Sequence, residues 1–215
     1  MKTAIKLKHG SNEWLEFRKS GIGGSEAAAI LGLSPWKSNI ELWEEKTGKA
    51  DPKDVSNNLA VEYGKKAEEH LTALFRLDHP ELRVESPKDY VYKRGFMFAS
   101  LDGELTDEKG RQGILEIKTT EIFASMAKEK WKDKVPDNYF WQVIHYMIVT
   151  DAKFAILSAQ LKSTDNSGDL YKRTMEYRFE RSELMQEMKY LYLKEKEFWD
   201  YVQKGIRPPL ILPPL

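Results

Sequence analysis

A short alternating segment near the middle of the chain constrains its fold more than any other feature. The segment Leu115-Glu116-Ile117-Lys118 has the period of two that is typical of a β-strand, in which successive side chains point to opposite faces. Its two apolar side chains would therefore face a hydrophobic core, while Glu116 and Lys118 would share the other face. The pattern predicts a sheet in which one strand carries a carboxylate and an ammonium group side by side.

A second strand with an acidic end precedes this segment. The apolar run Phe96–Leu101 ends directly before Asp102, and the turn-forming segment Thr106–Gly110 lies between Asp102 and Glu116. Turn residues between two strand-like runs predict a hairpin, which would bring Asp102 beside Glu116. Two carboxylates and a lysine at one place can hold a divalent cation and a water molecule against a phosphate. We therefore expect the metal site of a nuclease that cleaves phosphodiester bonds.

Further groups would complete such a site. The backbone carbonyl of Ile117 is a third oxygen, which suits Mg²⁺ because this ion prefers oxygen ligands and keeps several waters. Lys118 would orient the attacking water or accept its proton; the second role requires a lowered pKa, which a neighbouring divalent cation favours. Glu68, on a predicted helix four residues after Gly64, is a third carboxylate, and the glycine would allow a close approach. Gln142, a polar residue in a largely apolar helix, would hold Lys118 or the water.

The composition fits one globular unit. A chain of 215 residues can bury a sizeable core, and no internal repeat or linker divides it. We therefore expect a single α/β nuclease domain over residues 1–215, with a central mixed sheet flanked by helices. The Pro-rich segment 206–215 is expected to be an extended tail. Cysteine is absent, which excludes disulfides, thiol nucleophiles and iron–sulfur clusters.

Charge and hydropathy limit the partners and the compartment. The chain has 34 basic and 34 acidic residues and a net charge of +0, so DNA binding would require basic side chains gathered locally. No apolar run approaches the ~20 residues that span a bilayer, and the first residues lack the apolar core of a secretion signal. We expect a cytoplasmic protein with no membrane partner.

The periodicity of the remaining sequence predicts alternating helices and strands. Ser25 is expected to cap its helix. The predicted helices are Ser11–Lys19, Ser25–Leu31, Ile40–Lys46, Asn58–Leu77, Ile122–Lys132, Asn138–Val149 and Glu183–Val202. The predicted strands, besides the two described above, are Leu82–Glu85, Tyr90–Lys93, Phe154–Ala159 and Tyr171–Phe179.

The order of the polar residues resembles that of the PD-(D/E)XK nucleases. The shared elements are Glu68, Ser100-x-Asp102-Gly103, Glu116-x-Lys118 and Gln142. The family's proline before the aspartate is Leu101 here, at a position that does not bind metal.

The chain resembles one branch of these nucleases more narrowly, that of lambda exonuclease and the YqaJ-type viral recombinases. Two additional motifs carry this resemblance, one upstream and one downstream of the carboxylates. They are Trp14-x-x-x-Arg18 followed by Ser25-Glu26, and Tyr139-x-x-Gln142-Val143-x-x-Tyr146-Met147. The resemblance runs from about Trp14 to Thr150 and more loosely to Val202.

The resemblance implies a three-layer, restriction-endonuclease-like α/β core and a divalent metal, Mg²⁺ or Mn²⁺. It implies that Asp102, Glu116 and the Ile117 carbonyl are direct metal ligands. Glu68 would support a second metal or its waters. By the same resemblance, the residues that activate and assist the attacking water are Lys118 and Gln142.

The resemblance also implies that Arg18 and Ser25 bind the 5′-phosphate of a DNA end. Chemistry agrees with this role, since a guanidinium binds phosphate bidentately. Ser25 follows a glycine-rich loop, and a helix capped there would direct free N–H groups at an anion.

The activity implied by the resemblance is that of a 5′→3′ exonuclease. Such an enzyme degrades one strand of linear duplex DNA and leaves 3′ overhangs for a single-strand annealing protein of a phage or prophage in a bacterial host cell. A ring-shaped homotrimer is expected, and the tail would dock a neighbouring subunit or the annealing protein, or be disordered. The alternatives are a structure- or sequence-specific endonuclease with the same core, and a non-catalytic module that binds DNA ends.

Overall fold

The computed structural model describes residues 2–8, 10–55, 57–121, 131, 134–164 and 167–212. The helices are α1 (Asn12–Lys19), α2 (Ala27–Ile30), α3 (Asn39–Lys46), α4 (Leu59–Asp78), α6 (Asp137–Thr150) and α7 (Met185–Lys204), with 3₁₀-helices η1 (Gly24–Glu26) and η2 (Arg181–Glu183). The strands are β1 (Thr3–Lys6), β2 (Ile22–Gly23), β3 (Arg83–Glu85), β4 (Tyr90–Arg94), β5 (Met97–Ala99), β6 (Gly103–Thr106), β7 (Gln112–Glu121), β8 (Phe154–Thr164) and β9 (Leu170–Glu180).

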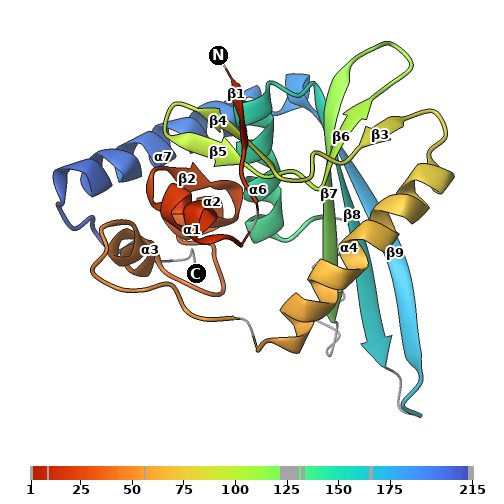
Figure 1. Cartoon of the computed structure of the whole chain (residues 1–215), viewed down its shortest axis with the longest axis horizontal. Helices are drawn as coiled ribbons and strands as arrows, with labels where there is room; N and C mark the ends of the chain where they lie inside the picture. Colours follow the sequence, from red (N-terminus) through yellow and green to blue (C-terminus); the bar gives the residue numbers. More distant parts are fainter. Residues whose placement is uncertain are drawn as a thin grey trace.

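A five-stranded mixed sheet with the order β3-β6-β7-β8-β9 forms one half of the molecule. Its central strand, β7, runs antiparallel to β6 and parallel to β8. The predicted alternation of β7 is confirmed, because Leu115 and Ile117 pack with Phe75 of α4 in one hydrophobic cluster. Helix α4 crosses this face of the sheet (Figure 1). The opposite face, which carries Glu116, is turned toward α6.

Helix α6 is the central element of the fold. Its residues 142–150 are all buried, as expected of a helix that is apolar on every side. Val143 and Met147 share a cluster with Leu157 of β8 and with Met97 of β5. Helix α6 therefore fills the space between the five-stranded sheet and a second, four-stranded sheet with the order β1-β4-β5-β2.

A second sheet accompanies the predicted central mixed sheet. Strands β4 and β5 were expected, but they pair with β1 and β2, which the apolar pattern did not predict. Strand β2 is two residues long and parallel to β5, and such a short strand leaves no periodic signal. Except for Trp131, which lies in a turn, the predicted helix Ile122–Lys132 falls outside the described residues.

The C-terminal tail has no helix or strand over residues 206–212, as predicted. It lies against its own chain, where the Asn39 side-chain amide donates to the Pro209 carbonyl at 2.8 Å and accepts the Ile211 N–H at 3.1 Å. Docking of the tail on a neighbouring subunit or on an annealing protein stays a prediction. In the described ranges, no helix has the length and apolar character needed to cross a membrane.

Candidate active site

Asp102 sits where strand β6 begins, and its side chain reaches the edge of β7. Strand β6 pairs with β7 from Gly103 opposite Leu115 back to the hairpin turn. The Asp102 carboxylate accepts the Ile117 N–H at 2.7 Å. Asp102 thus bonds to the part of β7 that β6 leaves uncovered. The predicted hairpin turn before β7 is confirmed, but the strand that pairs with β7 is β6. The apolar run before Asp102, predicted to be that strand, forms β5 in the other sheet. Asp102 still lies near Glu116, because it directly precedes β6.

Glu116 is the buried centre of a hydrogen-bond cluster. Its side chain projects from β7 toward α6, and the residue is 2% exposed. Oε1 accepts from Lys118 Nζ at 2.6 Å and from Gln142 Nε2 at 2.7 Å. Oε2 is buried without a hydrogen-bond partner among the described residues. A buried carboxylate oxygen in that condition is unfavourable unless a donor or a cation reaches it.

The cluster holds three carboxyl groups and one ammonium group, and the pKa of each carboxyl group is raised. Burial, reinforced by Asp102, raises the pKa of Glu116 to about 8. Burial and Asp102 also raise the pKa of Glu68 to about 7, although Glu68 lies closer to solvent. Burial raises the pKa of Asp102 itself, despite the nearby Lys118. One ammonium group does not neutralise these carboxylates, and a divalent cation would favour their charged forms.

Lys118 is a charged partner of Glu116 in this structure. Burial alone would lower its pKa, but Glu116 and Asp102 outweigh burial, and the pKa of Lys118 is raised. The lowered pKa needed by a proton acceptor is therefore not a property of the protein on its own. The Lys118 ammonium also lies 5.3 Å from the centroid of the Tyr139 ring.

The donor set fits a hard divalent cation that keeps some of its water. Among the described residues, no three Asp, Glu, His or Cys side chains are grouped so that they could hold a metal ion. The oxygens present at this site are those of the Asp102 and Glu116 carboxyl groups and the Ile117 carbonyl. The N–H and C=O of one strand residue point to the same side, so the Ile117 carbonyl faces the same edge as its N–H, which Asp102 accepts. Such a set of oxygens suits Mg²⁺, which retains waters.

Helix α4 brings Glu68 to this edge through a close contact with β7. A Cβ atom on Gly64 would lie 3.3 Å from Thr119 Oγ1, which confirms the expected close approach at this glycine. Glu68 follows one turn later, and its charge acts on Glu116. Its position suits contact with metal-bound water.

The hydrogen bonds of Gln142 are made to groups other than Lys118, the first of its two predicted partners, and a bond to the attacking water stays a prediction. Its amide donates to Glu116 and to the Tyr146 hydroxyl, at 3.1 Å for the latter, and Lys118 is held by Glu116. The sequence placed Gln142 at the site through its polarity in an apolar helix, but the partner depends on the register between α6 and β7.

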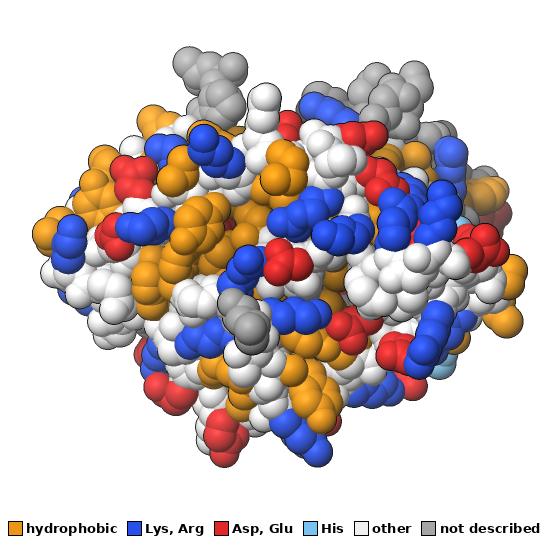
Figure 2. Space-filling model, turned by 90° about the horizontal axis from the view of Figure 1, so that it is seen from above, with side chains coloured by type: hydrophobic (Ala, Val, Ile, Leu, Met, Phe, Trp, Pro, Cys, Tyr) orange, Lys and Arg blue, Asp and Glu red, His pale blue; other side chains and the backbone are white. Residues whose placement is uncertain are grey.

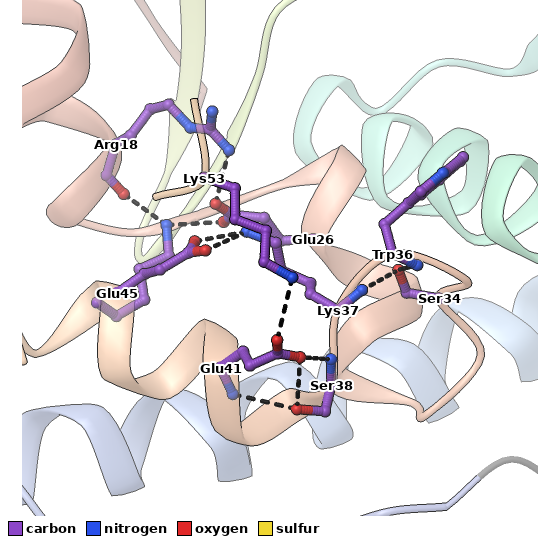
Figure 3. Close-up of polar contacts among 10 residues, drawn as sticks. Arg18, Glu26, Ser34, Trp36, Lys37, Ser38, Glu41, Glu45 and Lys53 are labelled. Carbon is purple, nitrogen blue, oxygen red and sulfur yellow. Dashed lines mark hydrogen bonds and ion pairs between the residues drawn. The ribbon is translucent and has the colours of Figure 1, made fainter. Parts of the chain in front are cut away.

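Arg18 takes part in a buried ionic cluster centred on Glu26 (Figure 3). Glu26 pairs with Arg18 at 2.9 Å and with Lys46 at 2.7 Å, and it accepts the Gly23 N–H at 2.9 Å. Burial alone would raise the pKa of Glu26, but Lys46 and Arg18 outweigh it and lower the pKa to about 2. Lys46 also donates to the Arg18 carbonyl at 2.6 Å. No sequence pattern pointed to Lys46, because a lysine at a helix C-terminus is ordinarily a surface residue.

Ser25 does not cap a helix, contrary to the prediction. It lies inside the 3₁₀-helix η1 and is exposed, while the Glu26 carboxylate accepts the N–H at the start of that helix. A longer side chain one position later thus performs the capping that the sequence pattern assigned to the serine.

Tyr146 links the Arg18 region to the carboxylates. Gly24 packs on it so closely that a Cβ atom would lie 2.3 Å from the Tyr146 ring. Burial, Glu116 and Asp102 raise the pKa of Tyr146 well above its usual range, and Arg18 opposes them. The Arg18 guanidinium and the carboxylates therefore act on the same hydroxyl group.

Comparisons with known proteins agree with this architecture. The solved alkaline exonuclease LHK-Exo from Laribacter hongkongensis superposes with a TM-score of 0.59 at 17% identity, over 90% of this chain and 95% of that chain. A phage related exonuclease from Haemophilus somnus 129PT gives a TM-score of 0.58 at 16% identity, over 89% and 99%. At these identities the likeness establishes the fold, and it confirms the predicted α/β nuclease core.

Sequence comparison identifies the family. The uncharacterized protein YqaJ of Bacillus subtilis (strain 168) is 34% identical over 146 residues, which are 66% of this chain and 43% of that protein. The chain therefore spans less than half the length of this relative. The family model described as YqaJ-like viral recombinase domain matches residues 13–153, a range that contains Arg18, the carboxylates and Gln142. The chain belongs to the YqaJ-like viral recombinase domain family.

Proposed function

We propose that this chain is a metal-dependent exonuclease that degrades duplex DNA. The observation that carries the proposal is the convergence of Asp102 and Glu116, with one Glu116 oxygen buried and without a hydrogen-bond partner in the described part of the chain. Family membership and the fold support a nuclease. Burial raises the pKa of each of these carboxyl groups, and Asp102 raises the pKa of Glu116 and Glu68 further. This arrangement has no evident structural purpose.

The proposed cofactor is Mg²⁺, with Mn²⁺ as the other candidate. Asp102, Glu116 and the Ile117 carbonyl would hold the ion, and Glu68 would hold its waters. A bound divalent cation neutralises charge at the scissile phosphate and lowers the pKa of a bound water.

The remaining side chains have distinct proposed roles. Lys118, on the same face as Glu116, would orient the attacking water and stabilise negative charge that develops on the phosphate. Acceptance of a proton by Lys118 would follow only if the cation lowers its pKa. Gln142 would fix the orientation of Glu116 through the 2.7 Å hydrogen bond, and Tyr146 in turn fixes Gln142.

We assign 5′→3′ polarity through Arg18 and Ser25, which would bind the 5′-phosphate of the DNA end. Arg18 has five N–H donors, and only one of its nitrogens is engaged by Glu26. Its side chain is part-exposed and stacks on Trp14, with the guanidinium 4.9 Å from the ring. Ser25 is exposed and directly precedes Glu26, the ion-pair partner of Arg18. Degradation from this end would leave 3′ overhangs for a single-strand annealing protein.

We propose that several copies of the chain assemble, because the face of one copy shown in Figure 2 is not uniformly basic. Lysine and arginine side chains are interspersed with acidic and hydrophobic ones on the face shown there, and the net charge is +0. A ring-shaped homotrimer would collect the basic groups of several copies along one DNA path. The proposed setting is the cytoplasm of a bacterial host that carries the phage or prophage.

The direct test compares DNA ends. We expect the wild-type protein in Mg²⁺ to degrade a 5′-phosphorylated linear duplex faster than the same duplex with 5′-hydroxyl ends. Arg18→Ala should remove that preference with little effect on the 5′-hydroxyl substrate. Labels at the 5′ and 3′ termini report which strand end is released first.

The alternatives give different results in the same assay. Cleavage of covalently closed circles would identify an endonuclease. Tight binding of ends without any cleavage in Mg²⁺ or Mn²⁺ would identify a non-catalytic module. Early release of the 3′-terminal label would contradict the assigned polarity.

A further inference from the structure

The loop between α2 and α3 presents an exposed tryptophan beside the proposed active site. Trp36 is 62% exposed, which is unusual for the side chain with the largest apolar surface. Its ring lies 6.3 Å from the Tyr139 ring, measured between centroids. Tyr139 is the residue whose ring the Lys118 ammonium contacts. One aromatic side chain therefore connects Trp36 to the proposed catalytic lysine.

The loop that carries Trp36 is held in place by its own polar contacts. Ser34 Oγ accepts the N–H groups of Trp36, at 3.2 Å, and of Lys37, at 3.4 Å. The Lys37 side chain is anchored to Glu45 of α3 by contacts of 2.5 and 2.6 Å. Figure 3 shows the Trp36 ring pointing away from this anchor. The exposed ring is thus presented by a fixed loop.

A groove lies beside the loop that carries Trp36, and Pro35, the residue before it, lines the groove. It has a volume of about 170 Å³ and runs between the loop and the start of α6. Its walls combine apolar side chains with amide, carboxylate and ammonium groups. The lining residues are Leu33, Pro35, Lys134, Pro136, Asp137 and Asn138.

We propose that Trp36 stacks on a nucleobase of the DNA at the end being degraded, with the groove receiving the adjoining nucleotide. This inference rests on the proposed nuclease function. Every base has a π-face, so an exposed aromatic ring binds single-stranded or unpaired bases without regard to sequence. Trp36 is continuous with the proposed active site through Tyr139, and Lys134 supplies a positive charge for the backbone. These features favour DNA over a protein partner as the occupant.

The test measures DNA binding and initial digestion rates for matched variants. Trp36→Ala and Trp36→Leu should weaken binding of a linear duplex about 5- to 100-fold, with a raised KM and a smaller change in kcat. Trp36→Phe keeps an aromatic face and should retain most of the affinity. Tyr190→Ala is the control, because Tyr190 is also exposed, at 49%, and also contacts an aromatic residue of α6, Trp141, at 5.8 Å.

A substrate series separates stacking from a structural role. Abasic positions introduced one at a time into the terminal nucleotides of each strand should weaken binding by the wild type at one position or two. The same substrates should leave the Trp36→Leu variant unaffected at those positions. Equal binding by wild type, Trp36→Ala and Trp36→Leu would overturn the inference. The inference would also be overturned if, at every position, an abasic site weakened binding by the same factor in the wild type and in Trp36→Leu. If the wild type fails to degrade linear DNA at all, it is the proposed function that fails.

Discussion

Among single residues, Glu116 gives the most specific indication of the chemistry of the site. Its pKa is raised to about 8, first by burial and then by Asp102, and an ordinary glutamate in an unfolded chain titrates near 4.5. The folded protein without metal therefore favours the protonated carboxyl. The stabilisation from this preference is complete below pH 4.5 and is lost as the pH rises through about 8.

This shift predicts a pH dependence of stability in the presence of a chelator. The wild type should lose on the order of a few kcal/mol of unfolding free energy between pH 5 and pH 8. Glu116→Gln should lose less over the same interval, because its amide does not titrate. His145 and His79, whose pKa values are raised by Glu195 and by Glu81 and Glu176 against the effect of burial, contribute equally to both proteins. Urea unfolding at the two pH values measures the difference, and parallel losses in both proteins would contradict the raised pKa of Glu116.

A second residue-level prediction concerns the cluster that holds Arg18. Glu26→Gln should destabilise the protein by about 3–5 kcal/mol, because it leaves the buried Lys46 ammonium without its partner. Lys46→Met should be milder, since Glu26 keeps Arg18 and the Gly23 N–H. The double variant should be less destabilised than the sum of the single ones. Urea unfolding at pH 7 tests this, and a wild-type stability for Glu26→Gln would show that the cluster is not buried as described.

At the scale of elements, the packing of η1 on α6 depends on a single glycine. A Cβ atom at Gly24 would lie 2.3 Å from the Tyr146 ring, whereas one at Gly64 would meet only the Thr119 hydroxyl, at 3.3 Å. Gly24→Ala should therefore force the two elements apart and destabilise the fold by about 1–3 kcal/mol. Gly64→Ala is the control; its gain of up to about 1 kcal/mol in helix propensity offsets the tight contact. Thermal unfolding of both variants checks the contrast, and equal effects would contradict the assigned packing.

The elements also show what sequence patterns can and cannot predict. The period of two in β7 and the apolar run of α6 predicted which faces are buried, because burial of one face is what produces those periods. The pairing of β1 with β4 was not predictable. It joins residues about ninety positions apart through backbone hydrogen bonds, and these bonds do not depend on the type of side chain. The same distinction between local and long-range contacts applies to the site. The nearness of Asp102 and Glu116 was predicted, because the turn between them is local. Lys46 and the Gln142–Glu116 bond required the tertiary arrangement.

At the scale of the whole molecule, metal binding should couple to folding. A cation that binds only the folded protein raises the unfolding free energy by about 2.7 kcal/mol when its concentration is 100 times its Kd. We expect Mg²⁺ or Mn²⁺ to raise the Tm of the wild type and to leave that of Asp102→Asn unchanged. Glu121→Gln is a matched control, because Glu121 lies at the exposed end of β7 and pairs with Lys162. Equal stabilisation of all three proteins would place the metal elsewhere.

We propose above that Asp102 and Glu116 form a metal centre that degrades DNA from its ends. The most direct measurement is digestion of one plasmid sequence, either linearised or covalently closed, by wild type and Glu116→Gln in Mg²⁺ and in a chelator. We expect that only the wild type in Mg²⁺ degrades DNA, and that it degrades only the linear form. Degradation of linear DNA by Glu116→Gln, or by the wild type in the chelator, would contradict it.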